Sequence, residues 1–367
     1  MKIGLLIKRI RKYKKDYIIR KGYKLLYKKI GEQNPFLTQP VEGEKLWLKK
    51  WKLVDKNISV CSYRIFSRYV GYKIDIMPLE TCAVLVEPSL CPISYFDFYN
   101  DKIVFDKLFP NGFLPQTLVR NINGFYYDEN YQPLNERIID DFLNRGNKVV
   151  IKPTVGGESG KGVQIFTKYN GIWKNKKGDV ISKDYLELSY HENFIIQEYL
   201  QQSLFMNSFN NSSVNTIRIM TYRSVINDEI YVPNAILRVG ASGEEVDNAH
   251  HGGMFCGISD NGTLGKYMCN FLGMKRTVFN GVDYEKNNFV IPNYEQVINF
   301  AKRVARQVIH HRLLALDIML DIDNQPRLIE INVGGFSAWL FQFTTGSVFK
   351  EYTDEIVEYC LHEYPLL

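Results

Sequence analysis

Hydrophobic positions follow two different rhythms along this chain. In the first hundred residues they recur every three or four positions, which predicts amphipathic helices over 1–30, 45–54 and 63–71. The exception is the apolar run 82–88, which is bounded by turn residues and predicts a buried strand. After residue 101 short apolar runs dominate, and they predict strands over 148–152, 163–166, 194–200, 215–222, 231–239, 313–321 and 327–332. Helical spacing returns over 292–311 and 353–362, so we expect an α+β fold.

The segment 31–43 reads as a linker, because it contains Pro35 and Pro40 among polar amides. The same changes in the spacing of hydrophobic residues divide the chain further. We expect a basic helix with its linker, a small N-terminal subdomain, and two larger β-rich parts. Their predicted bounds are 1–43, 44–100, 101–200 and 201–367.

Charge changes the interpretation of the first helix. The net charge is +6, yet residues 1–30 hold 12 Lys or Arg and a single acid, Asp16, so the rest of the chain is mildly acidic. Ile3, Leu6, Ile10, Tyr13 and Tyr17 fall on one helix face. A basic helix with aromatic residues suits an anionic membrane surface or an acidic protein partner. Alternatively, the apolar stripe packs on the body and the charges are solvated. Nucleic acid is not favoured, because the basic residues do not continue onto the body.

A glycine-rich loop connects two of the predicted strands. The sequence KPTVGGESGKGV begins at Lys152, a strand residue, and enters the next strand at Val163. Glycines let backbone N–H groups converge on an anion, and a hydroxyl and an ammonium group add donors. The candidate residues are Gly156, Gly157, Ser159, Gly160, Lys161 and Gly162. The spacing matches neither the Walker A loop nor the dinucleotide fingerprint, so this motif alone leaves a flexible hairpin open.

Acidic residues mark the last predicted hairpin. If it turns at 323–324, Asp317 lies opposite Glu330, and Asn332 follows on the same face. Two carboxylates and an amide oxygen at one place repel each other unless a cation lies between them. Oxygen ligands of this kind suit Mg²⁺. The alternative is a surface hairpin with solvated acids, but the flanking residues are apolar.

Several other classes of protein are not supported. No apolar stretch reaches the length of a membrane span, and the start is too short and too charged for a signal-peptide core. The six cysteines form no C-x-x-C pair, which indicates reduced thiols and a cytoplasmic setting. The sequence shows no Ser-His-Asp or Cys-His signature for nucleophilic catalysis.

The glycine-rich loop followed by the carboxylate hairpin resembles the ATP-grasp superfamily over about residues 106–340. The resemblance implies two β-rich lobes gripping ATP, with 101–200 as the nucleotide lobe and 201–367 as the metal lobe. It implies that Lys107 is the first nucleotide-binding lysine of that lobe, that Lys152 is the second and contacts the α- and β-phosphates, and that Gln197, Glu198 and Leu200 border adenine and ribose. It assigns Arg218 and Arg238 to the γ-phosphate and acyl-phosphate. It assigns Asp317, Glu330 and Asn332 to Mg²⁺.

The segments NTIRIMTY and VDNAHHGGMFCGI, with the Lys- and Tyr-rich start, resemble more narrowly the sugar-transfer-associated ATP-grasp proteins of bacterial polysaccharide loci. Asp247, Asn248, His250 and His251 would then belong to a loop that faces an acceptor or a phosphate. A capped turn is the alternative for this loop.

The resemblance implies a ligase in which a carboxylate takes the γ-phosphate of ATP and an amine then displaces phosphate. The setting suggests that an amino acid or another amine amidates a uronic acid of a sugar nucleotide or surface polysaccharide, with the basic helix near the inner membrane face. A phosphotransferase acting on a sugar hydroxyl and a non-catalytic nucleotide-binding scaffold are the two alternatives.

Overall fold

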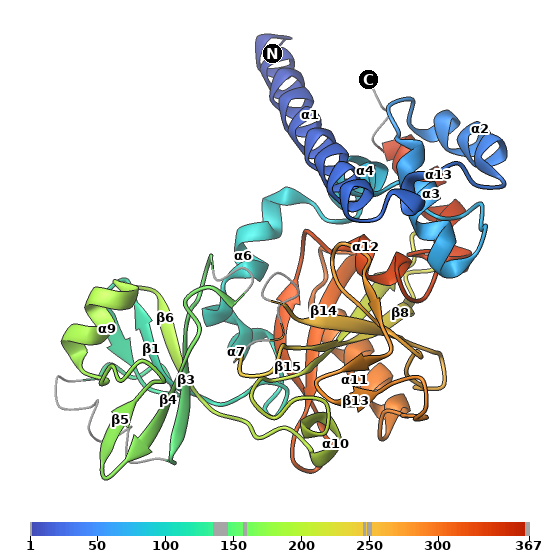
Figure 1. The fold of residues 1–367 in the computed structure, drawn as a ribbon. Helices are drawn as coiled ribbons and strands as arrows, with labels where there is room; N and C mark the ends of the chain where they lie inside the picture. The colour runs from blue at the N-terminus through green and yellow to red at the C-terminus, as the bar shows by residue number, and fades with distance from the viewer. Residues whose placement is uncertain (1, 135–145, 157–159, 245–246, 248–251, 364–367) are drawn as a thin grey trace.

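Two antiparallel sheets of unequal size form the body of the protein (Figure 1). The computed structural model describes residues 2–134, 146–156, 160–244, 247 and 252–363. Most of the predicted strands are present within one or two residues of their expected ends, which confirms the α+β class.

The smaller sheet has the strand order β2-β1-β6-β3-β4-β5. Its strands are β1 (Thr117–Ile122), β2 (Phe125–Tyr127), β3 (Lys148–Pro153), β4 (Gln164–Tyr169), β5 (Ile172–Lys174) and β6 (Phe194–Glu198). Helix α9 (Lys183–Tyr190) covers one face, where Leu186 packs against Val149, Ile151 and Phe166. The side chain of Ser182 caps this helix by accepting a hydrogen bond from the backbone N–H of Tyr185.

The larger sheet has the order β11-β10-β9-β8-β7-β14-β15. Its strands are β7 (Thr216–Arg223), β8 (Ile230–Val239), β9 (Met254–Ile258), β10 (Met268–Cys269), β11 (Lys275–Arg276), β14 (Leu313–Leu320) and β15 (Pro326–Asn332). A separate hairpin joins β12 (Val278–Phe279) and β13 (Val282–Asp283), and α10 (Leu204–Asn207) precedes β7. Helix α11 (Tyr294–Gln307) packs on one face, where Ile217 and Ile219 meet Val297 and Ala301.

The opposite face of the larger sheet is divided along the strands. On β7, Met220 and Tyr222 lie in a core shared with the N-terminal helices, whereas Thr216 and Arg218 line a cleft. Because side chains alternate across a strand, these four residues share one face, with an apolar half and a polar half. The N-terminal helices therefore cover only the half of this face that carries no charged groups.

Helices from both ends of the chain form that cover. They are α1 (Lys2–Gln33), α2 (Glu44–Val54), α3 (Val60–Val70), α4 (Leu79–Thr81), α5 (Glu87–Leu90), α12 (Ala338–Gln342) and α13 (Thr353–Glu363). Helices α6 (Phe96–Asn100) and α7 (Phe105–Leu108) instead place Tyr99 and Phe105 in the core on the α11 side of the sheet. Short 3-10 turns add η1 (Pro35–Thr38), η3 (Ile93–Tyr95), η4 (Lys102–Val104) and η7 (Lys350–Tyr352). Trp47 and Trp51 are fully buried on one face of α2, as their spacing predicts. All six cysteines are unpaired.

The predicted strand over 82–88 is wrong. Cys82–Val86 form a π-helical turn, η2, which continues into α5. Cys82, Leu85 and Val86 are buried, and η2 packs between α1 and α13. An apolar run of this length does not distinguish a strand from a helix that is surrounded on all sides, and here the surrounding helices decided.

Helix α1 is present as predicted, and the alternative in which the stripe of Ile10, Tyr13 and Tyr17 packs on the body does not hold. Ile10, Tyr13 and Tyr17 are exposed, whereas Tyr27 and Ile30 lie in the core. The first half of α1 projects away from the body, with the N-terminus at its far end (Figure 1). No helix within the described ranges is long and apolar enough to cross a membrane.

Candidate functional site

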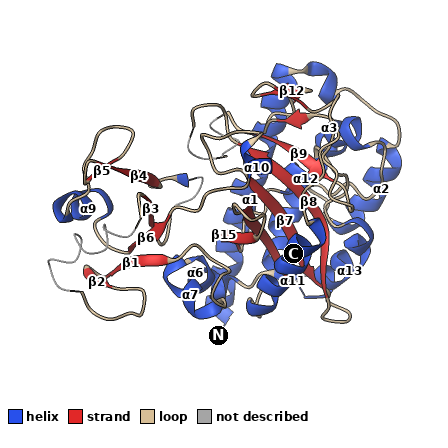
Figure 2. Ribbon diagram, turned by 90° about the horizontal axis from the view of Figure 1, so that it is seen from below, coloured by secondary structure: helices blue, strands red, loops and turns tan. Residues whose placement is uncertain are grey.

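A cleft of about 1320 Å³ lies between the two sheets and extends to α1. The smaller sheet stands to one side of the larger one, with α6 and α7 beside the gap (Figure 2). The smaller sheet contributes Val150, Lys152, Ile165 and Gln197 to the lining, and the larger sheet contributes Arg218, Arg238, Asp317, Glu330 and Asn332. Most residues predicted for the site therefore meet in one place.

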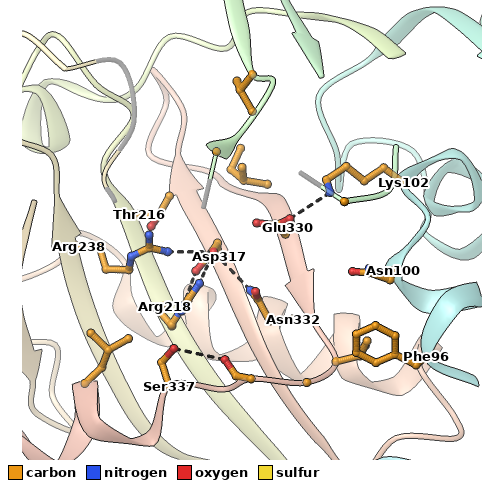
Figure 3. A pocket seen from close by; sticks show the side chains of 18 of the residues that line it. Phe96, Asn100, Lys102, Thr216, Arg218, Arg238, Asp317, Glu330, Asn332 and Ser337 are labelled. Atoms are coloured by element: carbon orange, nitrogen blue, oxygen red, sulfur yellow. Dashed lines mark hydrogen bonds and ion pairs between the residues drawn. The ribbon is translucent and has the colours of Figure 1, made fainter. Parts of the chain in front are cut away.

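Three neighbouring strands bring one aspartate and two arginines together on the cleft floor. Asp317 of β14 lies opposite Arg218 of β7, whose Nε and Nη2 donate to the two carboxylate oxygens at 2.8 and 2.7 Å. Arg238 of β8 adds a third hydrogen bond, from Nη1 to Oδ2, at 3.0 Å (Figure 3). Burial opposes ionisation, yet the two guanidinium groups lower the pKa of Asp317 to about 2. The carboxylate stays charged throughout the physiological range.

Asp247 continues this cluster on the side of Arg238. Its Oδ1 lies 3.0 Å from Nη2 of Arg238, and the Thr216 hydroxyl donates to its other oxygen. Burial raises the pKa of Asp247, and the arginine partly offsets that effect. Of the loop predicted to face a substrate, Asp247 is the residue that the structure describes at the cleft. Asn248, His250 and His251 lie outside the described residues.

Glu330 lies opposite Asp317 across β14 and β15, as predicted, but the hairpin reaches this register differently. The sequence-based register pairs residues 322 and 325. In the structure Leu320 faces Pro326, a shift of one residue, and a bulge at Ile329 restores the predicted pairing beyond it. The one-residue shift at the turn and the one-residue bulge cancel, so Asp317 and Glu330 still pair.

Positive side chains separate the acids of this hairpin. Glu330 turns toward Lys102, whose Nζ lies 3.1 Å from its Oε1, while Asp317 binds the arginines (Figure 3). Asn332 donates from Nδ2 to the backbone oxygen of Ala315 at 3.1 Å and to Asp317 at 3.4 Å. Protein cations therefore already hold these acidic groups close together, and a metal ion is not required to do so.

The donor set still fits Mg²⁺. Asp317, Glu330 and Asn332 present oxygen ligands from adjacent positions on one sheet face, which is the chemistry that this ion prefers. Within the described ranges no cluster of three or more His, Cys, Asp or Glu has metal-binding geometry. An ion at this place would therefore have two carboxylates and one amide from the protein, and would need further oxygens from water or phosphate.

Lys152 provides a positive charge across the cleft from this cluster. It lies on β3 opposite Ile195 of β6 and is 9% exposed. Burial, reinforced by the nearby ammonium group of Lys102, lowers the pKa of Lys152 to about 8. None of the described residues forms a hydrogen bond or ion pair with its ammonium group. A buried cation without a partner is unstable on its own, so this site favours an anion such as a phosphate.

The glycine-rich loop is only partly described. Gly156 and Gly160 have φ of 72° and 76° and line the cleft beside Lys152, so their backbone conformations favour glycine. Gly162, with φ of 78°, packs against the ring of Pro153, and Lys161 is exposed. Gly157 and Ser159 lie outside the described residues.

The segment 197–200 borders the cleft where β6 leaves the smaller sheet. Gln197 donates from Nε2 to the Thr117 hydroxyl at 3.0 Å, and Glu198 accepts the backbone N–H of Gln116 at 2.8 Å. Leu200 also lines the cleft. Val150 and Ile165 of the smaller sheet, with Met319 and Ile329 of the larger sheet, make the neighbouring walls apolar. A flat heteroaromatic ring fits between such walls.

Lys107, the first predicted phosphate lysine, is not among the described residues that line the cleft. It lies on α7 with Nζ 4.0 Å from the centre of the Tyr131 ring. Lys102 lines the cleft instead. Two Asp-Lys pairs lie close together in the sequence, at 101–102 and 106–107, and nothing local to them shows which lysine faces the nucleotide site. Lys102 is the cleft residue that the local sequence pattern did not reveal.

The fold and this arrangement define a protein of the ATP-grasp class. The sequence profile described as sugar-transfer associated ATP-grasp matches residues 87–358, and the chain belongs to that family. No curated protein matches the sequence.

Several solved structures are similar to the chain at low identity, with TM-scores below 0.5. An ADP complex of N5-carboxyaminoimidazole ribonucleotide synthetase is 12% identical with a TM-score of 0.36, and the match covers 64% of this chain and 45% of that one. D-alanine–D-alanine ligase from Bacillus anthracis is 15% identical with a TM-score of 0.38, and the match covers 76% of this chain and 70% of that one. D-cycloserine synthetase is 14% identical with a TM-score of 0.43, and the match covers 74% of this chain and 73% of that one. The chain thus spans less than half the length of the first of these proteins.

Proposed function

We propose that this protein is an ATP-dependent carboxylate–amine ligase that works through an acyl-phosphate and releases ADP and phosphate. The observation that carries the proposal is Lys152, a buried ammonium group for which the described part of the chain shows no hydrogen-bond or ion-pair partner. It lies across one cleft from a cluster of two arginines, two carboxylates and an amide. Phosphoryl transfer depends on positioning and charge neutralisation, and these side chains provide both.

Each group has a distinct part in this chemistry. Lys152 and the amides near Gly156 and Gly160 bind the phosphates, and the apolar walls beside Leu200 hold the base. Asp317, Glu330 and Asn332 would hold Mg²⁺, which supplies charge neutralisation to the phosphate oxygens when bound. Arg218 and Arg238 face the same space and stabilise the negative charge that develops on the transferred group.

The substrates we propose follow from the family. A sugar-transfer association favours a uronic acid of a sugar nucleotide or surface polysaccharide as the carboxylate, and an amino acid or another amine as the nucleophile. The attacking nitrogen forms the C–N bond, the C–O bond to phosphate breaks, and phosphate leaves with the electron pair.

We also propose that the first half of α1 binds the anionic inner face of a membrane. Ile10, Tyr13 and Tyr17 are exposed on a segment rich in Lys and Arg, and that segment projects from the body (Figure 1). Aromatic and aliphatic side chains insert at a membrane interface while basic residues contact lipid phosphates. This would hold the enzyme near membrane-linked sugar substrates.

Calorimetry with Mg·ATP tests the nucleotide site without knowledge of the acceptor. The wild type should bind in the micromolar range, and Lys152→Ala should lose most of that affinity. ADP release should then require a carboxylate and an amine together. ADP release with a sugar alcohol and no amine would show a phosphotransferase instead, and no nucleotide binding by folded protein would favour a scaffold.

A further inference from the structure

The cleft continues past the nucleotide site to a part, here called the chamber, that takes no part in the proposed phosphate chemistry. Its charged lining residues are Arg11, Lys12, Lys15 and Asp16 of α1 and Glu87 of α5. Its apolar lining residues include Ile19, Tyr23, Val84, Pro88, Trp339 and Leu340. This chamber is where α1, the helix at the start of the chain, meets the loop that follows β15.

Glu87 is fixed at the inner end of this chamber. Its Oε2 accepts the backbone N–H of Gly335 at 3.1 Å. Gly335 comes three residues after Asn332, and three residues of extended chain span at most about 10 Å, so the Gly335 backbone that Glu87 contacts lies within about 10 Å of the Asn332 backbone. This is a suitable separation for a second substrate beside the transferred phosphoryl group.

The charges of the chamber have both signs. Lys15 lies near enough to stabilise the ionised form of Glu87, and the described residues include no hydrogen-bond or ion-pair partner for Lys15 or Arg11. Lys12, on the same helix, is already paired with Asp16 at 2.9 Å. A phosphate group would gain from Lys15 but would be repelled by Glu87. A ligand with one positive and one negative group satisfies both side chains.

We propose that Glu87 and Lys15 form the subsite for the amine substrate, and that this substrate is an amino acid. Glu87 binds its ammonium group and Lys15 binds its carboxylate, while the apolar walls surround its side chain. This inference rests on the proposed ligase function. The bound ammonium group must give up one proton before its nitrogen can attack the acyl-phosphate, and Glu87 is the group placed to accept it. The second nitrogen proton leaves with the departing phosphate.

The environment of Glu87 is consistent with both tasks. Burial raises the pKa of this carboxyl to about 7, and backbone N–H groups and the Lys15 ammonium group oppose that rise. The titratable groups that face it are Lys15 and Tyr23 of α1, Cys82 of η2 and Cys91. Because only the ionised form binds an ammonium group, amino acid affinity should fall as the pH drops below about 7.

The full chain with Mg²⁺ and a non-hydrolysable ATP analogue provides the test. The probes are the standard amino acids of both chiralities, each compared with its amide and with the carboxylic acid that lacks the amino group. We expect at least one amino acid to bind in calorimetry, and neither analogue to match it. Glu87→Gln and Lys15→Met should each weaken binding by about tenfold or more, the loss of one charged contact.

Two controls separate binding from structure. Glu87→Gln keeps an oxygen that can accept the Gly335 N–H, so its thermal unfolding should match the wild type. Lys14→Met removes an exposed charge next to Lys15 and outside the cleft lining, and should leave amino acid affinity unchanged.

The proposal is overturned if the protein binds the nucleotide but no amino acid, or if Glu87→Gln binds the amino acid as well as the wild type does. Binding of inorganic phosphate or a sugar nucleotide that Lys15→Met abolishes and Glu87→Gln leaves intact would also overturn it, and would assign the chamber to a phosphate. Absence of nucleotide binding would instead count against the ligase function itself.

Discussion

Asp317 and Arg218 face each other directly across β14 and β7, and the guanidinium group holds both carboxylate oxygens at 2.8 and 2.7 Å. The pair is buried and is shared with Arg238. It is therefore both part of the predicted metal site and part of what holds the centre of the larger sheet together. Mutations here should change stability and nucleotide chemistry at once, and the two effects need separate measurements.

Asp317→Asn should abolish turnover and destabilise the fold. The substitution keeps the shape but leaves the buried Arg218 without a negative partner, while Arg238 keeps Asp247, so the free energy of unfolding should fall by about 3–5 kcal/mol. Urea denaturation followed by circular dichroism measures the loss, and ADP release measures the activity. Glu330→Gln is the matched control: its carboxylate is half-exposed with one ion pair, so unfolding should change by less than about 1 kcal/mol. An active Asp317→Asn enzyme would contradict the metal assignment.

The same pair predicts an acid-sensitive contribution to stability. The pKa of Asp317 is lowered to about 2, so the unfolded chain takes up the proton first as the pH falls. The stabilisation is complete above the ordinary aspartate range and is lost as the pH falls toward 2. The difference in unfolding free energy between the wild type and Asp317→Asn should therefore be constant from pH 5 to 8 by this argument. It should shrink in unfolding experiments at pH 3, and a constant difference down to that pH would contradict the assignment.

Lys152→Met should separate nucleotide binding from stability. The pKa of Lys152 is lowered to about 8, so the folded protein carries a penalty at neutral pH that is relieved as the pH rises above 8. The variant should lose roughly 10- to 100-fold in Mg·ATP affinity. It should unfold at the same or a higher temperature than the wild type, and its stability should change less between pH 7 and 9. A variant that is less stable at pH 7 would show that Lys152 has a structural partner.

Lys102→Met and Lys107→Met distinguish the two candidate lysines. Lys102 lines the cleft and contacts Glu330, whereas Lys107 stacks on Tyr131. Loss of Lys102 should weaken Mg·ATP binding in calorimetry by roughly tenfold, because one charged contact to the phosphates or to Glu330 disappears. Lys107→Met should bind as the wild type does. The reverse result would restore the sequence-based assignment.

Membrane binding by α1 should depend on its exposed aromatic residues. Tyr13→Ser with Tyr17→Ser should reduce sedimentation with vesicles made of equal parts phosphatidylglycerol and phosphatidylcholine. Deletion of residues 1–30 is a poor test, because Tyr27 and Ile30 belong to the core. Leu188→Ser, which changes an exposed residue of α9, should have no effect. Equal sedimentation of the tyrosine variant and the wild type would contradict the proposal.

Local patterns in the sequence determined much of the fold. Strands such as β3 and β14, and helices such as α2 and α11, appear where periodicity predicts them, because their buried faces repeat at the intrinsic spacing of the element. The pairing of Asp317 with Glu330 was also predicted correctly. The hairpin itself was not, because a turn of one length with a bulge gives the same pairing as a turn of another length without one.

Tertiary structure determined the features of the fold and of the site that hydrophobic periodicity does not specify. It made 82–88 helical, because that run is enclosed by other helices and any regular structure would bury it. It turned Ile10, Tyr13 and Tyr17 of α1 outward and brought Lys15 to Glu87, since a helix with apolar residues on several sides takes its packed face from its neighbours. It also selected Lys102 over Lys107 and placed arginines between the acids. Contacts between residues far apart in the sequence, 79 positions for Arg238 and Asp317, fixed these choices, and no local pattern records them.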